Sequence, residues 1–163
     1  MSGKTKRRSA LVLVMFLCAA ALLYAEDAPP VVAVVPLTAT GVTQEEAETF
    51  AARLAETFAA GFSATVADSK AVGSLLERYG GAKFEVLEVE RSLAFAAEAG
   101  ADILIGGTIG CFLETFTAFI TVLNVNPAVI SVIIREGDSM DALMATIPSL
   151  YAEFLEYVAA RSE

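Results

Sequence analysis

The segment of residues 31–37, Val-Val-Ala-Val-Val-Pro-Leu, constrains the fold most, because it is apolar at every position. A strand that is apolar on both faces belongs inside a sheet that is covered on both sides. Pro36 falls near the end of the segment, where the loss of one hydrogen bond is tolerated. We therefore predict a central strand and, with it, a layered α/β domain.

Helical periodicity follows this strand. Residues 38–42 are predicted to be a loop, and Thr43-Gln44-Glu45-Glu46 has the form of a capping box that starts a helix. Gly61 is placed to end that helix. Its inward positions share a helical spacing, and they are Ala47, Phe50, Ala51, Leu54 and Phe58.

The rest of the chain continues to alternate between strand-like and helix-like patterns of apolar residues. We predict a short strand at 62–67, helices at about 69–79 and 86–99, and a strand that starts at Ala101. Residues 115–122 and 129–134 are predicted to form an antiparallel hairpin. A final helix starts near Ser139, and Pro148 is expected to kink or break it. The prediction is a single α/β domain over residues 31–163 with a mixed sheet and the order βαβααβββα.

Three glycines, Gly106, Gly107 and Gly110, follow the apolar run that starts at Ala101. A dinucleotide site needs such glycines between a strand and the helix that it opens, and a P-loop needs a lysine beside them. The residues that follow here, Cys-Phe-Leu-Glu-Thr-Phe, have the pattern of a strand, and no lysine is adjacent. The glycines are therefore predicted to serve a bend, a bulge or a close contact within the scaffold.

The amino terminus predicts export. Basic residues at positions 4–8 precede an apolar run over 10–24, and Ala25 provides a small residue before two acidic ones. This is the layout of a signal peptide covering residues 1–25, with residues 26–30 as a linker. Retention of the segment as a membrane anchor is one alternative. Lipidation of Cys18 is another, although Leu17 is bulkier than the residue that usually precedes a lipidated cysteine.

Charge and composition restrict the chemistry. Cleavage after Ala25 removes four of the 11 basic residues and none of the 20 acidic ones, which leaves a net charge of −13. A field of this sign repels nucleic acid and anionic lipid, so nucleic acid is excluded as a main partner, and the membrane is reached only through the amino terminus. The chain has no histidine, the most common general base, and no catalytic, metal or cofactor site is predicted. Cys111 is expected to be a buried structural thiol.

Four stretches together resemble a known family. They are Val-Val-Ala-Val-Val-Pro-Leu, Gly-Val-Thr-Gln-Glu-Glu-Ala, Gly-Ala-Asp-Ile-Leu-Ile-Gly-Gly-Thr-Ile and Ile-Thr-Val-Leu-Asn-Val-Asn-Pro-Ala. The chain is similar here to the periplasmic α/β domain of CsgG-like curli-assembly proteins, of lipoprotein activators of penicillin-binding proteins, and of the TolB amino-terminal region. The resemblance implies an envelope protein that binds other proteins or itself and has no catalytic residues. The chain has no clear room for the long hairpins that form the curli pore.

Function is therefore predicted to be protein interaction or assembly in the periplasm or outer envelope, without enzymatic activity. The expected interaction surface lies on the hairpin and the final helix, at Phe116, Phe119, Thr121 and Tyr151, although Phe112, Phe116 and Phe119 fit a core role better. The alternative is a periplasmic small-ligand binder or a carboxylate-based enzyme that uses the loop at 38–42 beside the glycines. A polar pocket near Thr40 and Gly107 would favour that alternative.

Overall fold

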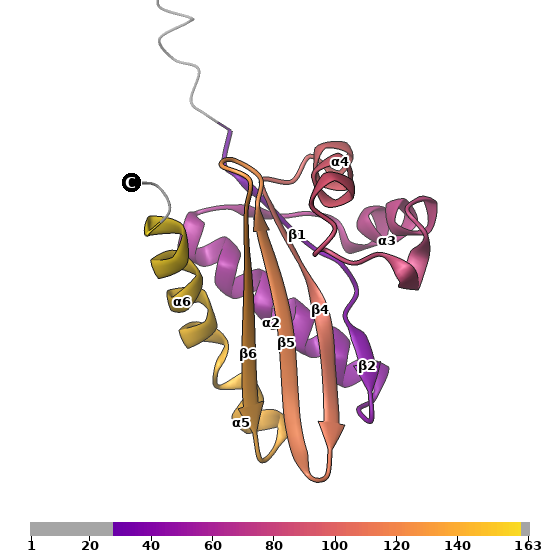
Figure 1. The fold of residues 1–163 in the computed structure, drawn as a ribbon, viewed down its shortest axis with the longest axis vertical. Coiled ribbons are helices and arrows are strands. Elements are labelled where there is room, and N and C mark those ends of the chain that lie inside the picture. Colours follow the sequence, from indigo (N-terminus) through magenta and orange to yellow (C-terminus); the bar gives the residue numbers. More distant parts are fainter. Residues whose placement is uncertain (1–27, 161–163) are drawn as a thin grey trace, which may run out of the picture.

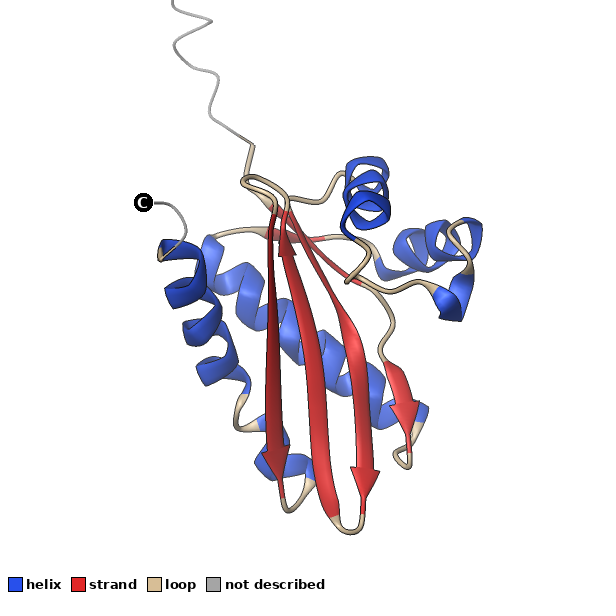
Figure 2. Ribbon diagram, in the orientation of Figure 1, coloured by secondary structure: helices blue, strands red, loops and turns tan. Residues whose placement is uncertain are grey.

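The computed structural model describes residues 28–160, which form one α/β domain around a six-stranded mixed sheet (Figures 1 and 2). The strand order is β3-β1-β4-β5-β6, and β2 pairs with β4 beyond the end of β1. The strands are β1 (Val31–Val34), β2 (Thr38–Thr40), β3 (Thr65–Val66), β4 (Ile103–Phe112), β5 (Thr115–Asn124) and β6 (Val129–Gly137). The helices are α2 (Gln44–Phe62), α3 (Ser69–Arg78), α4 (Val89–Ala99), α5 (Met140–Met144) and α6 (Ile147–Ala159), with a 3-10 turn, η1, at Gly81–Lys83.

The sheet combines two kinds of pairing. Strands β1, β2 and β3 pair in parallel with their neighbours, whereas β4, β5 and β6 form a long antiparallel meander. The predicted hairpin of β5 and β6 is therefore confirmed, and its turn contains a cis Asn126–Pro127 peptide bond. The predicted mixed-sheet α/β class is confirmed as well.

Helices cover the two faces of the sheet unequally. On one face, α2, α5 and α6 pack over most of the sheet and bury a large core that includes Phe50, Phe58 and Phe154. On the other face, α3 and α4 bury a smaller core around Phe95 at one end of the strands. Figure 1 shows β4, β5 and β6 in front of α2, with no helix in front of their lower halves. That half of the sheet face is open.

The capping box at the start of α2 is confirmed. The backbone N–H of Thr43 donates to Oε2 of Glu46 over 2.8 Å, and the backbone N–H of Glu46 donates to Oγ1 of Thr43 over 3.2 Å. The predicted end at Gly61 is wrong, because α2 continues to Phe62 and ends at Ser63 in the left-handed conformation (φ 51°). Phe62 packs its ring against Phe58 and Tyr151, and these contacts favour one more helical residue.

The predicted loop at 38–42 is also wrong at its start. After Pro36 interrupts β1, the chain returns to the edge of β4, and Thr38–Thr40 pairs with residues 108–110. β-branched threonines suit this position, because one side of the strand is exposed. Conversely, the predicted strand at 62–67 shortens to Thr65–Val66.

Pro148 breaks the last helical segment rather than kinking a continuous helix. α5 ends at Met144, and α6 starts at Ile147 with Pro148 in its first turn. Proline is well tolerated there because the first backbone N–H groups of a helix have no partner within the helix.

Candidate interaction surface

The open half of the sheet carries exposed apolar side chains. Phe119 on β5 is 37% exposed, and Val132 and Ile134 on β6 are 42% and 52% exposed. Phe119 lies directly opposite Ile134 in the β5–β6 register. Side chains at directly opposed positions contact one another, so these residues form a continuous patch. We call Phe119, Val132 and Ile134 the open patch.

The alternation along each strand explains why these residues face outward. Residues 118, 120 and 122 of β5 point into the large core, so Phe119 points the other way. On β6, Ile133 is buried while Val132 and Ile134 are exposed. Nothing in α3 or α4 reaches this far, since their core ends near Leu104 and Leu123.

A shallow hollow of about 210 Å³ lies beside the open patch. Ala82 and residues 84–87 form one wall, and Gly106, Gly107, Thr108 and Phe119 belong to the other. Thr40 is not part of the lining, and Glu85 is the one carboxylate within it. Small-molecule sites usually enclose about 300–1,000 Å³. The hollow is therefore small for a ligand site, and its lining holds one carboxylate, that of Glu85, rather than a pair.

The glycines fit a role in close packing, as predicted. A Cβ atom on Gly106 would lie 2.5 Å from Cγ2 of Val86, and one on Gly107 would overlap the carbonyl oxygen of Phe119. Gly107 also has φ +146°, which side-chain-bearing residues rarely adopt. The three glycines lie within β4, so no helix N-terminus is available there to hold a phosphate.

The tip of the β4–β5 hairpin is apolar and exposed. Phe112 is 60% exposed and Leu113 is 100% exposed, so the expectation that Phe112 belongs to the core is wrong. Leu113 and Glu114 form the turn with φ values of 49° and 68°. Two-residue hairpin turns of this kind favour asparagine and glycine, because other residues are strained there.

The structure separates the four predicted surface residues into two pairs. Phe119 and Thr121 lie on the open face, but Thr121 is only 3% exposed. Phe116 and Tyr151 pack against the large core on the opposite face. Tyr151 makes an edge-to-face contact with Phe58 at a centroid distance of 5.1 Å. The sheet thus places Phe119 alone of the four in the open patch.

Sequence reasoning missed Val132 and Ile134. The signal was present in residues 129–134, where every position except Ser131 is apolar. The edge strand of a sheet with one covered face should alternate apolar and polar residues. Apolar residues on both faces therefore indicate that the second face has a contact of its own.

Charges near the open patch are acidic. Glu136 follows on β6 opposite Thr117, Glu114 lies in the hairpin turn, and Glu85 lines the hollow. The nearby Arg135 is turned to the helical face, where its Nη2 contacts Oε2 of Glu153 at 2.5 Å. Arg135 also donates from Nη1 to the carbonyl oxygen of Ile134 over 2.9 Å, which occupies part of the β6 backbone edge.

The two groups with shifted pKa values lie elsewhere. Hydrogen bonds from the backbone and side chain of Thr43 lower the pKa of Glu46. Burial raises the pKa of Tyr79, and its hydrogen bond to Glu98 adds to the effect. Both shifts have local structural causes and neither indicates a reactive site.

Within residues 28–160 we also searched for a metal site, a reactive thiol and a membrane-spanning helix. No group of three or more acidic or cysteine side chains is arranged to hold a metal ion in this range, and Glu88 pairs with Arg91 at 3.0 Å. Cys111 is a free, half-buried thiol rather than a fully buried one. Cys18 and the rest of the predicted signal peptide lie outside the described residues. Among the described helices, none is both long and apolar enough to cross a membrane.

Comparisons with known proteins find similar solved structures. No protein-family model matches the chain, and no curated protein matches it. The LpoB C-terminal domain from Salmonella enterica is 15% identical with a TM-score of 0.46, over 72% of this chain and 89% of that chain. A PelC dodecamer from Paraburkholderia phytofirmans is 19% identical with a TM-score of 0.46, over 81% and 89%.

The lipoprotein GNA1162 from Neisseria meningitidis is 13% identical with a TM-score of 0.47, over 82% of this chain and 99% of that chain. At these identities and TM-scores, the similarity assigns neither a family nor a function to this chain.

Proposed function

We propose that this chain is a non-enzymatic protein-interaction module of the cell envelope, which binds a partner protein through the open patch. The observation that carries the proposal is the exposure of Phe119, Val132 and Ile134 at adjacent positions of one sheet face. A contiguous apolar area on a sheet face costs free energy in water unless something covers it. Isolated exposed apolar residues need no such explanation, but these three are grouped.

Docking onto the face is favoured over addition of a strand at the edge. Arg135 already donates to the carbonyl of Ile134, so part of the β6 edge is occupied. The apolar side chains, by contrast, stand on the face itself. Leu87, which is 46% exposed and lines the hollow, extends the same apolar area toward α4.

Charge favours a basic partner over a second copy of this chain. Residues 28–160 contain 17 acidic and six basic residues, and Glu85, Glu114 and Glu136 lie around the open patch. Two copies would bring like charges together, which opposes association. A partner with an apolar centre and lysine or arginine at its rim would complement the surface.

Export remains part of the proposal because it rests on residues 1–25. The predicted signal peptide would place the domain in the periplasm or outer envelope, and the resemblance to CsgG-like and TolB amino-terminal domains agrees with that location. Mass measurement of the amino terminus of the exported protein separates cleavage after Ala25 from lipidation at Cys18 and from retention of the anchor.

A matched pair of surface variants tests the proposed surface. Ile134→Glu places a charge in the open patch, and Leu155→Glu places one on α6, at a leucine that is 39% exposed and outside the patch. Tagged protein is recovered from crosslinked envelopes, and folding of both variants is checked by urea denaturation. The proposal predicts one stoichiometric partner that Ile134→Glu loses and Leu155→Glu keeps. Equal recovery by both variants, or self-association alone, would contradict it.

A further inference from the structure

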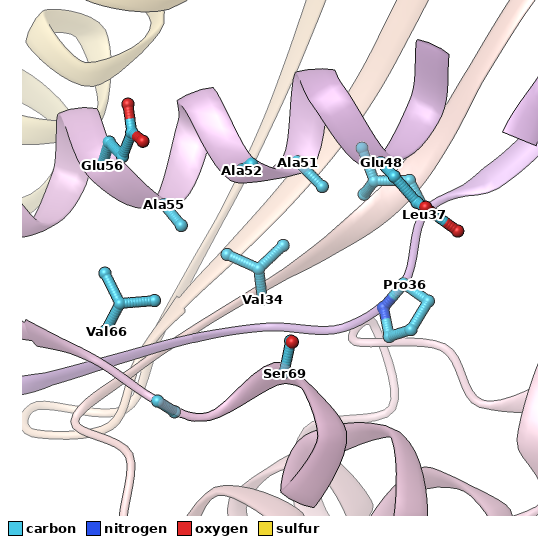
Figure 3. A pocket seen from close by; sticks show the side chains of 11 residues that line it. Val34, Pro36, Leu37, Glu48, Ala51, Ala52, Ala55, Glu56, Val66 and Ser69 are labelled. Atoms are coloured by element: carbon cyan, nitrogen blue, oxygen red, sulfur yellow. The ribbon is translucent and has the colours of Figure 1, made fainter. Parts of the chain in front are cut away.

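A second candidate site lies at the opposite edge of the sheet from β6. A groove of about 690 Å³ runs between α2 and the outer edge of β1, where β1 has no further partner strand in the described chain (Figure 3). β3 pairs with β1 only at Val31 and Val32, and the chain then turns away into α3. The groove lies beyond the end of β3, where Ala67 and Ser69, at the start of α3, belong to its lining.

Apolar side chains line the middle of the groove. Ala51 and Ala55 of α2 point toward Val34 of β1, and Val66 stands at the end where β3 stops (Figure 3). Val66 is 49% exposed although it is β-branched and apolar. The alanine side chains are short, and larger side chains at these positions would fill the groove.

The charged residues of the lining are both acidic. Glu48 and Glu56 lie on α2 at the two ends of the groove, and the lining contains no lysine or arginine. Glu56 has an ion pair with Arg53 at 3.4 Å, but both side chains are about two-thirds exposed, so that pair holds the carboxylate weakly. Lys70, next to the lining residue Ser69, is exposed and is not part of the lining.

Spacing on the helix defines the occupant. Glu48 and Glu56 are eight residues apart, which corresponds to about 12 Å along a helix. An extended chain covers about 12 Å in roughly four residues, and residues two apart share a face. We infer that the groove binds an extended peptide segment of another protein, with two basic side chains four residues apart and a small apolar side chain midway between them.

This site is independent of the open patch, because it lies on the other edge of the sheet and uses other residues. Beyond Val32, whose carbonyl already accepts from Ala67, the outer edge of β1 in the groove offers the backbone N–H and carbonyl of Val34, because Pro36 has no N–H. Val34 would therefore contact the backbone of the segment, and the two carboxylates would select its charge. A partner that engaged both surfaces would contact the domain on opposite edges of the sheet.

A labelled peptide tests the inference directly. Fluorescence polarisation measures binding of Thr-Lys-Thr-Val-Thr-Lys-Thr to the purified exported protein. A peptide of the same composition with adjacent lysines, and one with glutamates in place of the lysines, serve as controls. We expect the spaced peptide to bind at least tenfold more tightly than either control. Equal binding of the two lysine peptides, or no binding of the spaced one, would overturn the inference.

Protein variants locate the binding. Glu48→Gln with Glu56→Gln removes both charges, and Ala52→Trp fills the groove from an exposed lining position. Each is expected to weaken binding at least tenfold, whereas the charge-matched control Glu77→Gln with Glu90→Gln should leave it unchanged. The same loss in the control pair would show non-specific attraction and would refute the site. Ile134→Glu should not change the binding of this peptide. The proposed groove site and the proposed function of the open patch can therefore be refuted independently.

Discussion

Gly107 is the single residue on which the geometry beside the open patch depends most. It brings β4 against the backbone of Phe119, where any Cβ atom would overlap the carbonyl oxygen. Its φ of +146° adds a second reason for glycine. A side chain at this position would have to push β5 away and would displace Phe119 with it.

We therefore predict that Gly107→Ala lowers the free energy of unfolding by about 2–3 kcal/mol. Gly73→Ala is the matched control, because a methyl group on Gly73, within α3, would meet no neighbouring side chain or strand within 4 Å. That control should raise stability by about 0.5–1 kcal/mol through helix propensity. Urea denaturation measures both, and unchanged stability for Gly107→Ala would contradict the close contact.

At the scale of elements, the capping box is the local signal that the sequence carried most clearly. Thr43 and Glu46 satisfy each other's backbone N–H groups, so loss of the hydroxyl in Thr43→Ala should cost about 1 kcal/mol of stability. Denaturation at neutral pH measures this loss. An unchanged free energy of unfolding would mean that the cap does not stabilise the protein in solution.

The same box predicts a pH dependence. The pKa of Glu46 is lowered in the folded protein from its ordinary value of 4.5, chiefly by the backbone N–H of Thr43. The ionised carboxylate therefore stabilises the fold above pH 4.5, and this contribution is lost as the pH falls through the folded-state pKa. Glu46→Gln should destabilise the protein at pH 7, and this effect should shrink as the pH is lowered from 4.5 toward about 3. An equal effect at both pH values would exclude the carboxylate charge as the cause.

The hairpin tip is an element whose sequence disagrees with its turn. Leu113 and Glu114 both adopt positive φ, which costs about 1–2 kcal/mol per residue. Leu113→Asn combined with Glu114→Gly should therefore raise the midpoint of urea denaturation, while Leu113→Asn alone should raise it less. A lower midpoint for the double variant would show that the turn has another conformation in solution.

At the scale of the whole molecule, the sequence predicted the fold class, an α/β domain with a mixed sheet, better than the limits of the elements. Residues 31–37 indicated a central strand because burial on both faces demands apolar residues throughout. Pro36 lies after the end of β1, and the chain pairs with β4 again at β2, which begins just beyond that segment. Helix ends depended on distant contacts, such as that of Phe62 with Tyr151, which local patterns do not contain.

The candidate surface was less accessible to sequence reasoning than the fold. Phe116 and Phe119 look equivalent in the sequence, but three residues apart on a strand they face opposite sides. Which side lacks a helix depends on where α3 and α4 pack, and no local pattern specifies that. The groove beside β1 was invisible for the same reason, because α2 and Val34 meet only in the folded chain.

Site-specific photo-crosslinking in cells of the source organism tests the central claim most directly. A photoreactive amino acid replaces Phe119 or Ile134 in the open patch, and Leu155 on α6 serves as the control position. We predict one adduct with the same partner protein from both patch positions and none from position 155. Adducts of equal yield at all three positions, or no adduct from either patch position, would contradict the claim that the open sheet face is the binding surface.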